Sequence, residues 1–191
     1  MEQDSNADVN QLCVNLIIKD QIEGIPVTNV GAFAFRNHKN LKTIYIPNSI
    51  ILLQFDCFGY NDNLESVIFE ERYNTSLSIG RGVFVGCKKL KEIRLPSYLS
   101  SSGSWSFSGS GLKSIVYCGM TEIKDDWFSG TNPIVYVHNM YPYQNFSTNP
   151  NLIRTAHCGT YNYCFKQSIV YHNYSFDILK NYIYVIINII Y

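Results

Sequence analysis

The sequence has little charge and no excess of either sign. Among its 191 residues, 15 Lys and Arg balance 15 Asp and Glu, so the formal net charge is zero and only 16% of residues are charged. A neutral chain has no overall field that attracts nucleic acid or an anionic membrane, which argues against these partners as the basis of its main function. Hydrophobic residues still make up 46%, enough for the core of one domain with or without a tail.

Long apolar runs are also missing. Residues 1–10 are polar and lack a basic start, so they do not resemble a secretory signal peptide and indicate a cytoplasmic location. The stretch 178–191 is apolar, but its 14 residues fall short of the roughly 20 that a spanning helix needs. Residues 151–191, rich in Ile, Tyr and Asn, are interpreted as an apolar tail. A degenerate extension is favoured over an end that associates with a membrane or docks to a partner.

Motifs for catalysis and metal binding are absent. The sequence contains no glycine-rich phosphate loop, no G-x-S-x-G or H-E-x-x-H motif and no calcium loop. Asp125 and Asp126 indicate a solvated turn, because no further carboxylate recurs nearby. The last histidines and cysteines fit no usual zinc spacing and suggest no nucleophile with an orienting third group: His157, Cys158, Cys164 and His172. The sequence therefore predicts no enzyme, no metal and no cofactor, and its cysteines are expected to be reduced and largely buried.

What the chain does contain is an internal repeat marked by phenylalanine. The repeated residues are separated by 23, 26, 23 and 21 positions: Phe35, Phe58, Phe84, Phe107 and Phe128. Five or six residues later each repeat has an aliphatic residue, which opens the phrase Leu-x-x-[Ile/Val]-x-apolar in four copies and a blurred fifth copy at 134–137. Periods of 20 to 50 residues are typical of solenoids, in which each repeat buries its apolar edge against its neighbours.

Each phrase predicts one short strand. The fourth and sixth positions point to the same face, so stacked copies give a parallel sheet over a shared core, with the phenylalanine filling that core from the far side. Pro47 and Pro96 are expected to end two of these strands. Three extra residues within 70–78 predict a surface bulge. A sandwich or barrel is the alternative, but its strands would recur about every 8–12 residues.

These phrases resemble the BspA-like class of leucine-rich repeats, which occur in surface antigens of bacteria and protozoa. The resemblance covers about residues 22–146 and rests on the opening segment 24–30, on Ile44-Tyr-Ile-Pro-Asn-Ser-Ile50 and on Gly82-Val-Phe-Val-Gly-Cys87. The chain departs from the pattern at His38 and Asn61, where the family has Cys, and at Glu70, where it has a strand-ending proline. The resemblance implies a non-catalytic module at the cell surface that binds a host or bacterial surface protein.

Together, these observations predict a β-rich α/β fold: a leucine-rich-repeat solenoid of about five repeats with a short parallel sheet. Residues 1–21 are expected to form an N-terminal cap segment, 22–150 the solenoid and 151–191 the tail.

A binding face follows from the pleat. The third and fifth residues of each phrase point outward, on the side expected to be concave. The predicted protein-binding residues are Thr43, Tyr45, Ser66, Ile68, Glu92, Arg94, Ser114, Val116 and Tyr136. Tyr45, Arg94 and Tyr136 are the strongest candidates, because Tyr and Arg are enriched in interface anchors. The alternative is an ordinary solvated sheet face. Two functions remain open. The family resemblance favours a surface adhesin-type module, and the termini, which lack a signal-like segment, favour an intracellular interaction scaffold on the same solenoid.

Overall fold

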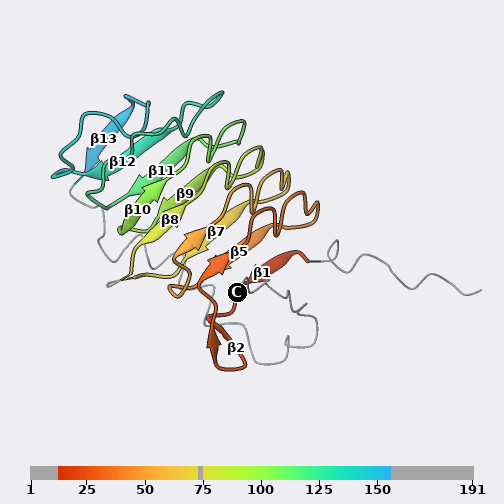
Figure 1. The fold of residues 1–191 in the computed structure, drawn as a ribbon. Coiled ribbons are helices and arrows are strands. Elements are labelled where there is room, and N and C mark those ends of the chain that lie inside the picture. The colour runs from red at the N-terminus through yellow and green to blue at the C-terminus, as the bar shows by residue number, and fades with distance from the viewer. Residues whose placement is uncertain (1–12, 73–74, 156–191) are drawn as a thin grey trace, which may run out of the picture.

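The computed structural model describes residues 13–72 and 75–155 and shows a solenoid whose turns stack along one axis (Figure 1). Each of the first four turns contributes to three sides. A long side and a short side are made of parallel strands, and a turn side carries the repeated phenylalanines. The strands follow one another across the molecule in chain order, so the repeat predicted from the sequence is the structural unit.

The long side comprises seven strands among the described residues. They are β1 (Asn15–Ile17), β5 (Thr43–Ile46), β7 (Ser66–Phe69), β9 (Glu92–Leu95), β11 (Ser114–Tyr117), β12 (Ile134–His138) and β13 (Leu152–Thr155). Hydrogen bonds join β1, β5 and β7 in one parallel ladder and β9, β11, β12 and β13 in another, and β7 lies beside β9. The predicted parallel arrangement is confirmed, and β5 and β9 end directly before Pro47 and Pro96.

The short side is a second parallel sheet. Its strands are β4 (Asn29–Val30), β6 (Leu52–Leu53), β8 (Leu77–Ile79) and β10 (Leu99–Ser102). Near the N-terminal end, β2 (Gln21–Ile22) and β3 (Ile25–Pro26) form a separate antiparallel hairpin.

The turn side returns the chain without a helix. No helix occurs within residues 13–72 and 75–155, so the α component of the predicted α/β fold is not confirmed. Backbone N–H groups of one turn donate to carbonyls of the next, as from Phe33 to Phe55 at 3.1 Å and from Phe35 to Cys57 at 2.8 Å. The backbone is left-handed at two positions of such a turn, with φ of 59° at Phe33 and 62° at Asn37. Left-handed residues at this spacing exclude a right-handed helix.

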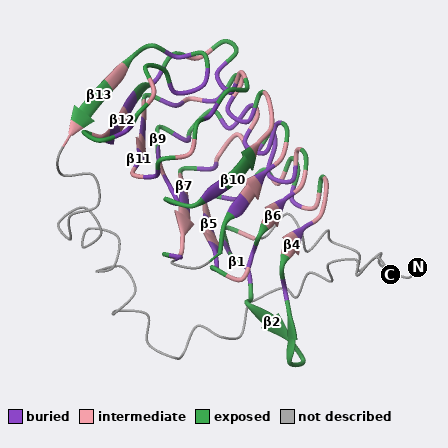
Figure 2. Ribbon diagram, turned by 60° about the vertical axis from the view of Figure 1, so that its left-hand side comes forward, coloured by how far each residue is buried: buried purple, intermediate pink, exposed green. Residues whose placement is uncertain are grey.

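The repeated phenylalanines form one stack through the core. Successive rings of Phe35, Phe58, Phe84, Phe107 and Phe128 have centroids 5.5, 5.7, 5.5 and 6.2 Å apart and lie nearly parallel. All five are buried, together with most of the inward residues of both strand sides (Figure 2). Full burial of such a side chain contributes about 1.5–3 kcal/mol, so this stack is a major source of stability. The prediction that the phenylalanines share one environment is confirmed.

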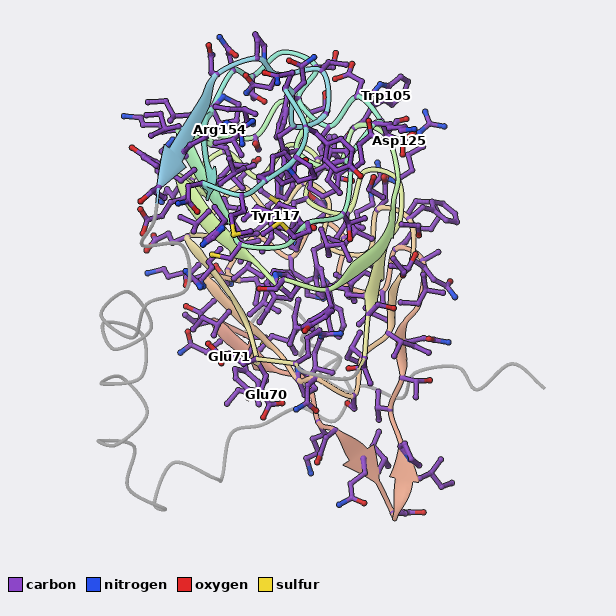
Figure 3. All side chains as sticks on the ribbon, turned by 90° about the vertical axis from the view of Figure 1, so that its left-hand side faces the viewer. Glu70, Glu71, Trp105, Tyr117, Asp125 and Arg154 are labelled. Atoms are coloured by element: carbon purple, nitrogen blue, oxygen red, sulfur yellow. The ribbon has the colours of Figure 1, made fainter. Side chains whose placement is uncertain are left out.

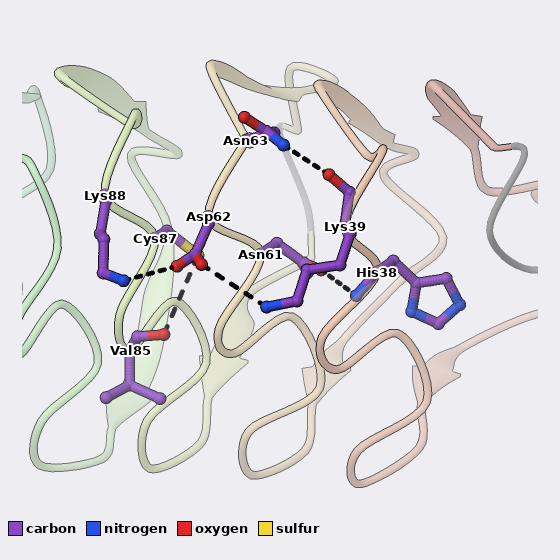
Figure 4. Close-up of polar contacts among 8 residues, drawn as sticks. All are labelled: His38, Lys39, Asn61, Asp62, Asn63, Val85, Cys87 and Lys88. Atoms are coloured by element: carbon purple, nitrogen blue, oxygen red, sulfur yellow. Dashed lines mark hydrogen bonds and ion pairs between the residues drawn. The ribbon is translucent and has the colours of Figure 1, made fainter.

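Hydrogen bonds from polar side chains join neighbouring turns where the chain runs from the turn side to the long side (Figure 4). Asn61 is fully buried and donates through Nδ2 to the carbonyls of Phe35 and Phe58 at 2.9 and 2.8 Å. Its Oδ1 accepts from the backbone N–H of His38 at 2.6 Å. One turn later, Cys87 donates its thiol to the Phe58 carbonyl at 3.3 Å. Asn61 stands where the family has cysteine. Like Cys87 it joins its turn to the preceding one, but it makes three hydrogen bonds.

The longest repeat, the 26-residue interval from Phe58 to Phe84, is held to the preceding turn by a buried arginine. Arg72 is only 4% exposed and donates to the carbonyls of Ile50 at 2.7 Å and Pro47 at 3.4 Å. Burial lowers the pKa of its guanidinium, and nearby Glu70 opposes that shift. The segment predicted to be a surface bulge therefore carries exposed residues such as Glu71 and also one side chain that holds it to the preceding turn.

The two ends of the described region extend the solenoid beyond the repeated phrases. β1 lies within the predicted cap segment 1–21 and pairs with β5, and β13 lies within the predicted tail 151–191 and pairs with β12. At the C-terminal end, Phe146 contacts Tyr117, Trp127 and Phe128 and covers the last turn of the core. Residues 156–191, which include most of the predicted tail, lie outside the described residues.

Candidate protein-binding face

The pleat of the long side sorts its residues as predicted. In β5, Ile44 and Ile46 are fully buried, whereas Thr43 and Tyr45 on the opposite face are partly exposed. None of the nine predicted binding residues is buried: Glu92 is exposed, and Thr43, Tyr45, Ser66, Ile68, Arg94, Ser114, Val116 and Tyr136 are partly exposed. The structure therefore places all nine on the outward face, and their role in binding remains a prediction.

The register of the strands sets these residues in two rows. The polar row contains the third residue of each phrase: Thr43, Ser66, Glu92 and Ser114. The second row, here called the outer row, contains the fifth residue of each of the four full phrases and Tyr136, which pairs with Val116: Tyr45, Ile68, Arg94, Val116 and Tyr136. Neighbouring strands lie about 4.8 Å apart, so the outer row is a nearly continuous strip of apolar and aromatic groups with one cation in the middle.

The structure extends the outer row at both ends with residues that the sequence analysis missed. Ile17 of β1 lies opposite Tyr45 and is 51% exposed, and Ile153 of β13 lies opposite Tyr136 and is 44% exposed. Neither strand carries the complete repeat phrase. The short apolar run Leu16-Ile17-Ile18, between Asn15 and Lys19, is the signal that could have indicated β1.

Arg94 is the permanent charge of the outer row. Its Nη2 lies 3.5 Å from Sγ of Cys118, one strand along, so the side chain runs over the neighbouring strand β11. A guanidinium in this position can pair with a carboxylate of a partner while the flanking Ile68 and Val116 exclude water.

Arg154, at the C-terminal edge of this side, has a structural task. It occupies an inward position of β13, where the core ends, and its guanidinium donates to the carbonyls of Tyr141 and Tyr143. These bonds satisfy carbonyls of the loop that closes the last turn. Arg154 is therefore treated as part of the scaffold of the face.

The described residues were also compared with the metal and nucleophile sites considered from the sequence. Within residues 13–72 and 75–155, no three His, Cys, Asp or Glu side chains gather into a group that could hold a metal ion. Asp126 accepts hydrogen bonds from the Phe128 N–H at 3.1 Å and the Thr148 hydroxyl at 3.2 Å, as expected of a turn residue. The other residues considered for a zinc site or a nucleophile lie outside the described residues: His157, Cys158, Cys164 and His172.

The described cysteines are structural. Cys13, Cys57 and Cys87 are free, whereas Cys118 is disulfide-bonded, so the expectation of reduced thiols is wrong for Cys118. Burial raises the pKa of Cys57 well above its usual range and that of Cys87 to about 12. These two thiols therefore stay protonated near neutral pH and are poor nucleophiles.

The described residues also contain no helix that is both long and apolar enough to cross a membrane.

Among solved structures, the chain is similar to a leucine-rich cell surface protein from Faecalibacterium prausnitzii. The identity is 19% and the TM-score 0.56, over 72% of this chain and 35% of that one. A leucine-rich repeat protein of T. pallidum matches at 19% identity and a TM-score of 0.43, over 84% of each chain. The pneumococcal vaccine antigen PcpA matches at 21% identity and a TM-score of 0.47, over 66% of this chain and 41% of that one.

The first of these similarities shows the fold, and this chain spans about a third of that structure's length. A comparison with curated proteins found no match. Residues 14–135 match the family described as BspA type leucine-rich repeat region, in six copies. This match covers more than half of the chain and the same turns that stack in the structure. The chain therefore belongs to the BspA-type leucine-rich repeat family.

Proposed function

We propose that this chain is a non-catalytic module that binds a protein ligand through the outward face of its long side. The observation that carries the proposal is the outer row, in which Tyr45, Ile68, Val116 and Tyr136 flank the single cation of Arg94. Protein interfaces concentrate their binding energy in a few aromatic and arginine side chains surrounded by groups that exclude water. The outer row has this composition, and the polar row beside it supplies hydrogen-bonding groups for a rim.

The rigidity of the strands supports the same proposal. The outward residues are held on backbone that pairs with a neighbour on each side in β5, β11 and β12, and their inward neighbours are locked in the core. A surface that is already ordered loses less conformational entropy when a partner binds. Family membership supports a protein-interaction role as well, whereas the identity of the ligand rests on the chemistry of the face.

The test compares the full chain with two variants. Immobilised wild-type protein, the double variant Tyr45→Ala/Arg94→Ala and the control Tyr98→Ala are exposed to extract of the native or host cells. Tyr98 is 50% exposed and precedes β10 on the short side, so it lies off the proposed face. We expect proteins retained by the wild type and the control to be lost from the double variant. A retained protein is then purified and titrated.

For that purified protein, removal of two interface anchors is expected to weaken binding at least tenfold, since each anchor contributes more than about 1 kcal/mol. Unchanged affinity of a correctly folded double variant would remove the outward face from consideration. Equal losses for Tyr98→Ala would show that the effect is not specific to the long side.

The location of the module is a separate proposal. A surface adhesin-type role is supported by the family and by the description of the Faecalibacterium protein as a cell surface protein. Brief protease treatment of intact native cells distinguishes the two functions. Cleavage of this chain while cytoplasmic marker proteins stay intact is expected for a surface module, and full protection would favour the intracellular scaffold.

A further inference from the structure

The turn side exposes a second group of large side chains that the repeat phrases do not explain. Four aromatic residues of its first, second and fourth turns are close to half exposed: Phe33 at 46%, Phe55 at 48%, Tyr60 at 42% and Trp105 at 46%. Two arginines of the first and third turns lie among them. We call these six residues the turn-side patch: Phe33, Arg36, Phe55, Tyr60, Arg81 and Trp105. Exposed aromatic groups gathered on one surface mark interaction sites more often than scattered ones do.

Three of these aromatic residues occupy backbone positions that favour glycine. The left-handed positions two residues before and two residues after the repeated phenylalanine hold Gly82, Gly86, Gly109 and Gly130 in the later turns, with φ between 62° and 80°. At equivalent positions Phe33, Tyr60 and Trp105 adopt φ of 59°, 59° and 64°. A left-handed conformation is unfavourable for a bulky side chain, and such positions concentrate at functional sites. The chain thus places rings where glycine would fold more easily.

The rings are held in fixed positions by their neighbours. The Arg36 guanidinium lies 5.3 Å from the ring centroid of Phe33 and 4.7 Å from that of Tyr60, and the Arg81 guanidinium lies 4.1 Å from that of Trp105. The Phe33 and Phe55 rings meet edge to face at 4.5 Å. The patch is therefore ordered before any partner arrives, which lowers the entropic cost of binding.

Glycines of the third turn make room for this arrangement. A Cβ atom built on Gly86 would lie 2.9 Å from the Tyr60 ring, and one on Gly82 would lie 2.1 Å from a carboxylate oxygen of Asp56. Side chains of the second turn therefore lean over the third.

The charge of the patch indicates the kind of partner. Arg36 has only a loose, partly exposed contact with Asp56 at 3.8 Å, and no carboxylate of the described residues pairs with Arg81. A guanidinium stacked on a ring keeps its in-plane N–H groups available, and those groups match the two oxygens of a carboxylate. The two guanidinium groups of the patch thus have one carboxylate partner, Asp56, so the patch carries a positive excess.

We propose that the turn-side patch binds an acidic polypeptide segment whose carboxylates pair with Arg36 and Arg81 and whose apolar side chains pack on the exposed rings. This site is separate from the face proposed for the long side. Trp105 and Arg154, the latter on β13 of the long side, lie on opposite sides of the solenoid (Figure 3). One molecule could therefore engage two protein segments at once.

The test titrates the full chain with a fluorescent random copolymer of glutamate and tyrosine. We expect Arg36→Gln/Arg81→Gln to weaken binding at least tenfold and Trp105→Gly to do the same while retaining its thermal midpoint, because glycine suits that backbone position. The matched control Lys89→Gln/Lys113→Gln removes the same charge from two exposed lysines outside the patch and is expected to stay within twofold. The long-side variant Tyr45→Ala/Arg94→Ala is also expected to stay within twofold.

Several results would overturn this proposal. Equal weakening by the lysine control would mean that general charge attracts the copolymer, and loss of binding in the long-side variant would assign it to the other face. Wild-type affinity in a folded Arg36→Gln/Arg81→Gln variant would exclude the arginines. Equally tight binding of polylysine or neutral dextran would exclude recognition of an acidic segment. The long-side proposal survives each of these outcomes, because its own variants are read against a different ligand.

Discussion

On strands β5, β7, β9, β11 and β12 of the long side, an inward residue that varies little is followed by an outward residue that varies widely in chemical type. The inward residues that lie at one register of these strands are β-branched and at most 3% exposed: Ile44, Val67, Ile93 and Ile115, each the fourth residue of its phrase, and Val135, which pairs with Ile115. The outward residue that follows varies from aromatic to aliphatic to cationic: Tyr45, Ile68, Arg94, Val116 and Tyr136. Both sets lie on the same strands in the same register, so the difference comes from what each face contacts.

This contrast separates the parts of the molecule that fix the fold from those that are free to recognise something. Inward residues share one close-packed core, where a change of even one methylene is felt by the neighbouring turns. Outward residues have solvent in front of them, so their identity is limited only by strand geometry. The turn side repeats the contrast: its buried phenylalanines are uniform, whereas the exposed residues beside them range from glycine to tryptophan.

The largest effect is expected in the middle of the phenylalanine stack. Phe84→Ala removes a fully buried ring between Phe58 and Phe107 and is expected to lower the free energy of unfolding by about 3–5 kcal/mol. The matched control is Phe55→Ala, where the ring is 48% exposed and the expected loss is about 1 kcal/mol or less. Denaturant unfolding measures both. Similar losses would show that the stack does not dominate stability.

A smaller effect is expected at the buried Asn61. Asn61→Ala leaves the Phe35 and Phe58 carbonyls without the side-chain donor, in a buried site, and is expected to cost about 2–3 kcal/mol. Asn63→Ala serves as the control, because its side chain donates only to the Lys39 carbonyl at a more exposed position and should cost about 1 kcal/mol or less. The same unfolding assay decides, and a cost at Asn63 equal to that at Asn61 would contradict the assigned role.

The smallest effect is expected from the ion pairs on the outside of the same turns. Asp62 lies 3.2 Å from Lys88 and 3.5 Å from Lys39, and its hydrogen bond with Lys88 holds the pKa of the carboxyl below its usual 3.8. A carboxyl whose pKa is lower in the folded than in the unfolded protein contributes stability at pH values above its unfolded pKa. That contribution is lost as the pH falls through the folded pKa. Because these groups are exposed, we expect Asp62→Asn to cost at most about 0.5 kcal/mol at neutral pH.

That difference between wild type and Asp62→Asn should shrink as the pH falls through the folded pKa of Asp62, and disappear once the carboxyl is protonated in both the folded and the unfolded protein. Unfolding curves at neutral pH and along an acid titration measure it. A difference that grows as the pH falls would contradict the assigned sign.

The inward half of this contrast could be predicted from the sequence. Because each phrase and each phenylalanine faces the same neighbours one turn away, the spacing of Phe35, Phe58 and Phe84 alone indicated the stack. The direction of the nine outward residues could also be predicted, since the pleat fixes the direction of each side chain once a strand is recognised.

The features that could not be predicted from the sequence depend on contacts between turns. The turn side contains no helix in the described residues, and the sequence did not indicate this. The reason is that residue types alone do not show which residues, such as Phe33 and Tyr60, adopt a left-handed backbone. Ile17 and Ile153 were missed since their strands lack the phrase. Arg72 was missed because a surface bulge gives no reason to expect a buried cation.

The most direct test of this separation compares two neighbouring positions of one strand. Ile44→Ala and the double variant Tyr45→Ala/Arg94→Ala are unfolded with denaturant, and their free energies of unfolding are compared with that of the wild type. We expect Ile44→Ala to lose about 2–5 kcal/mol, and the double variant to lose about 1 kcal/mol or less although it removes far more side-chain atoms. Losses of similar size in the two variants would contradict the claim that the outward residues are free of the fold.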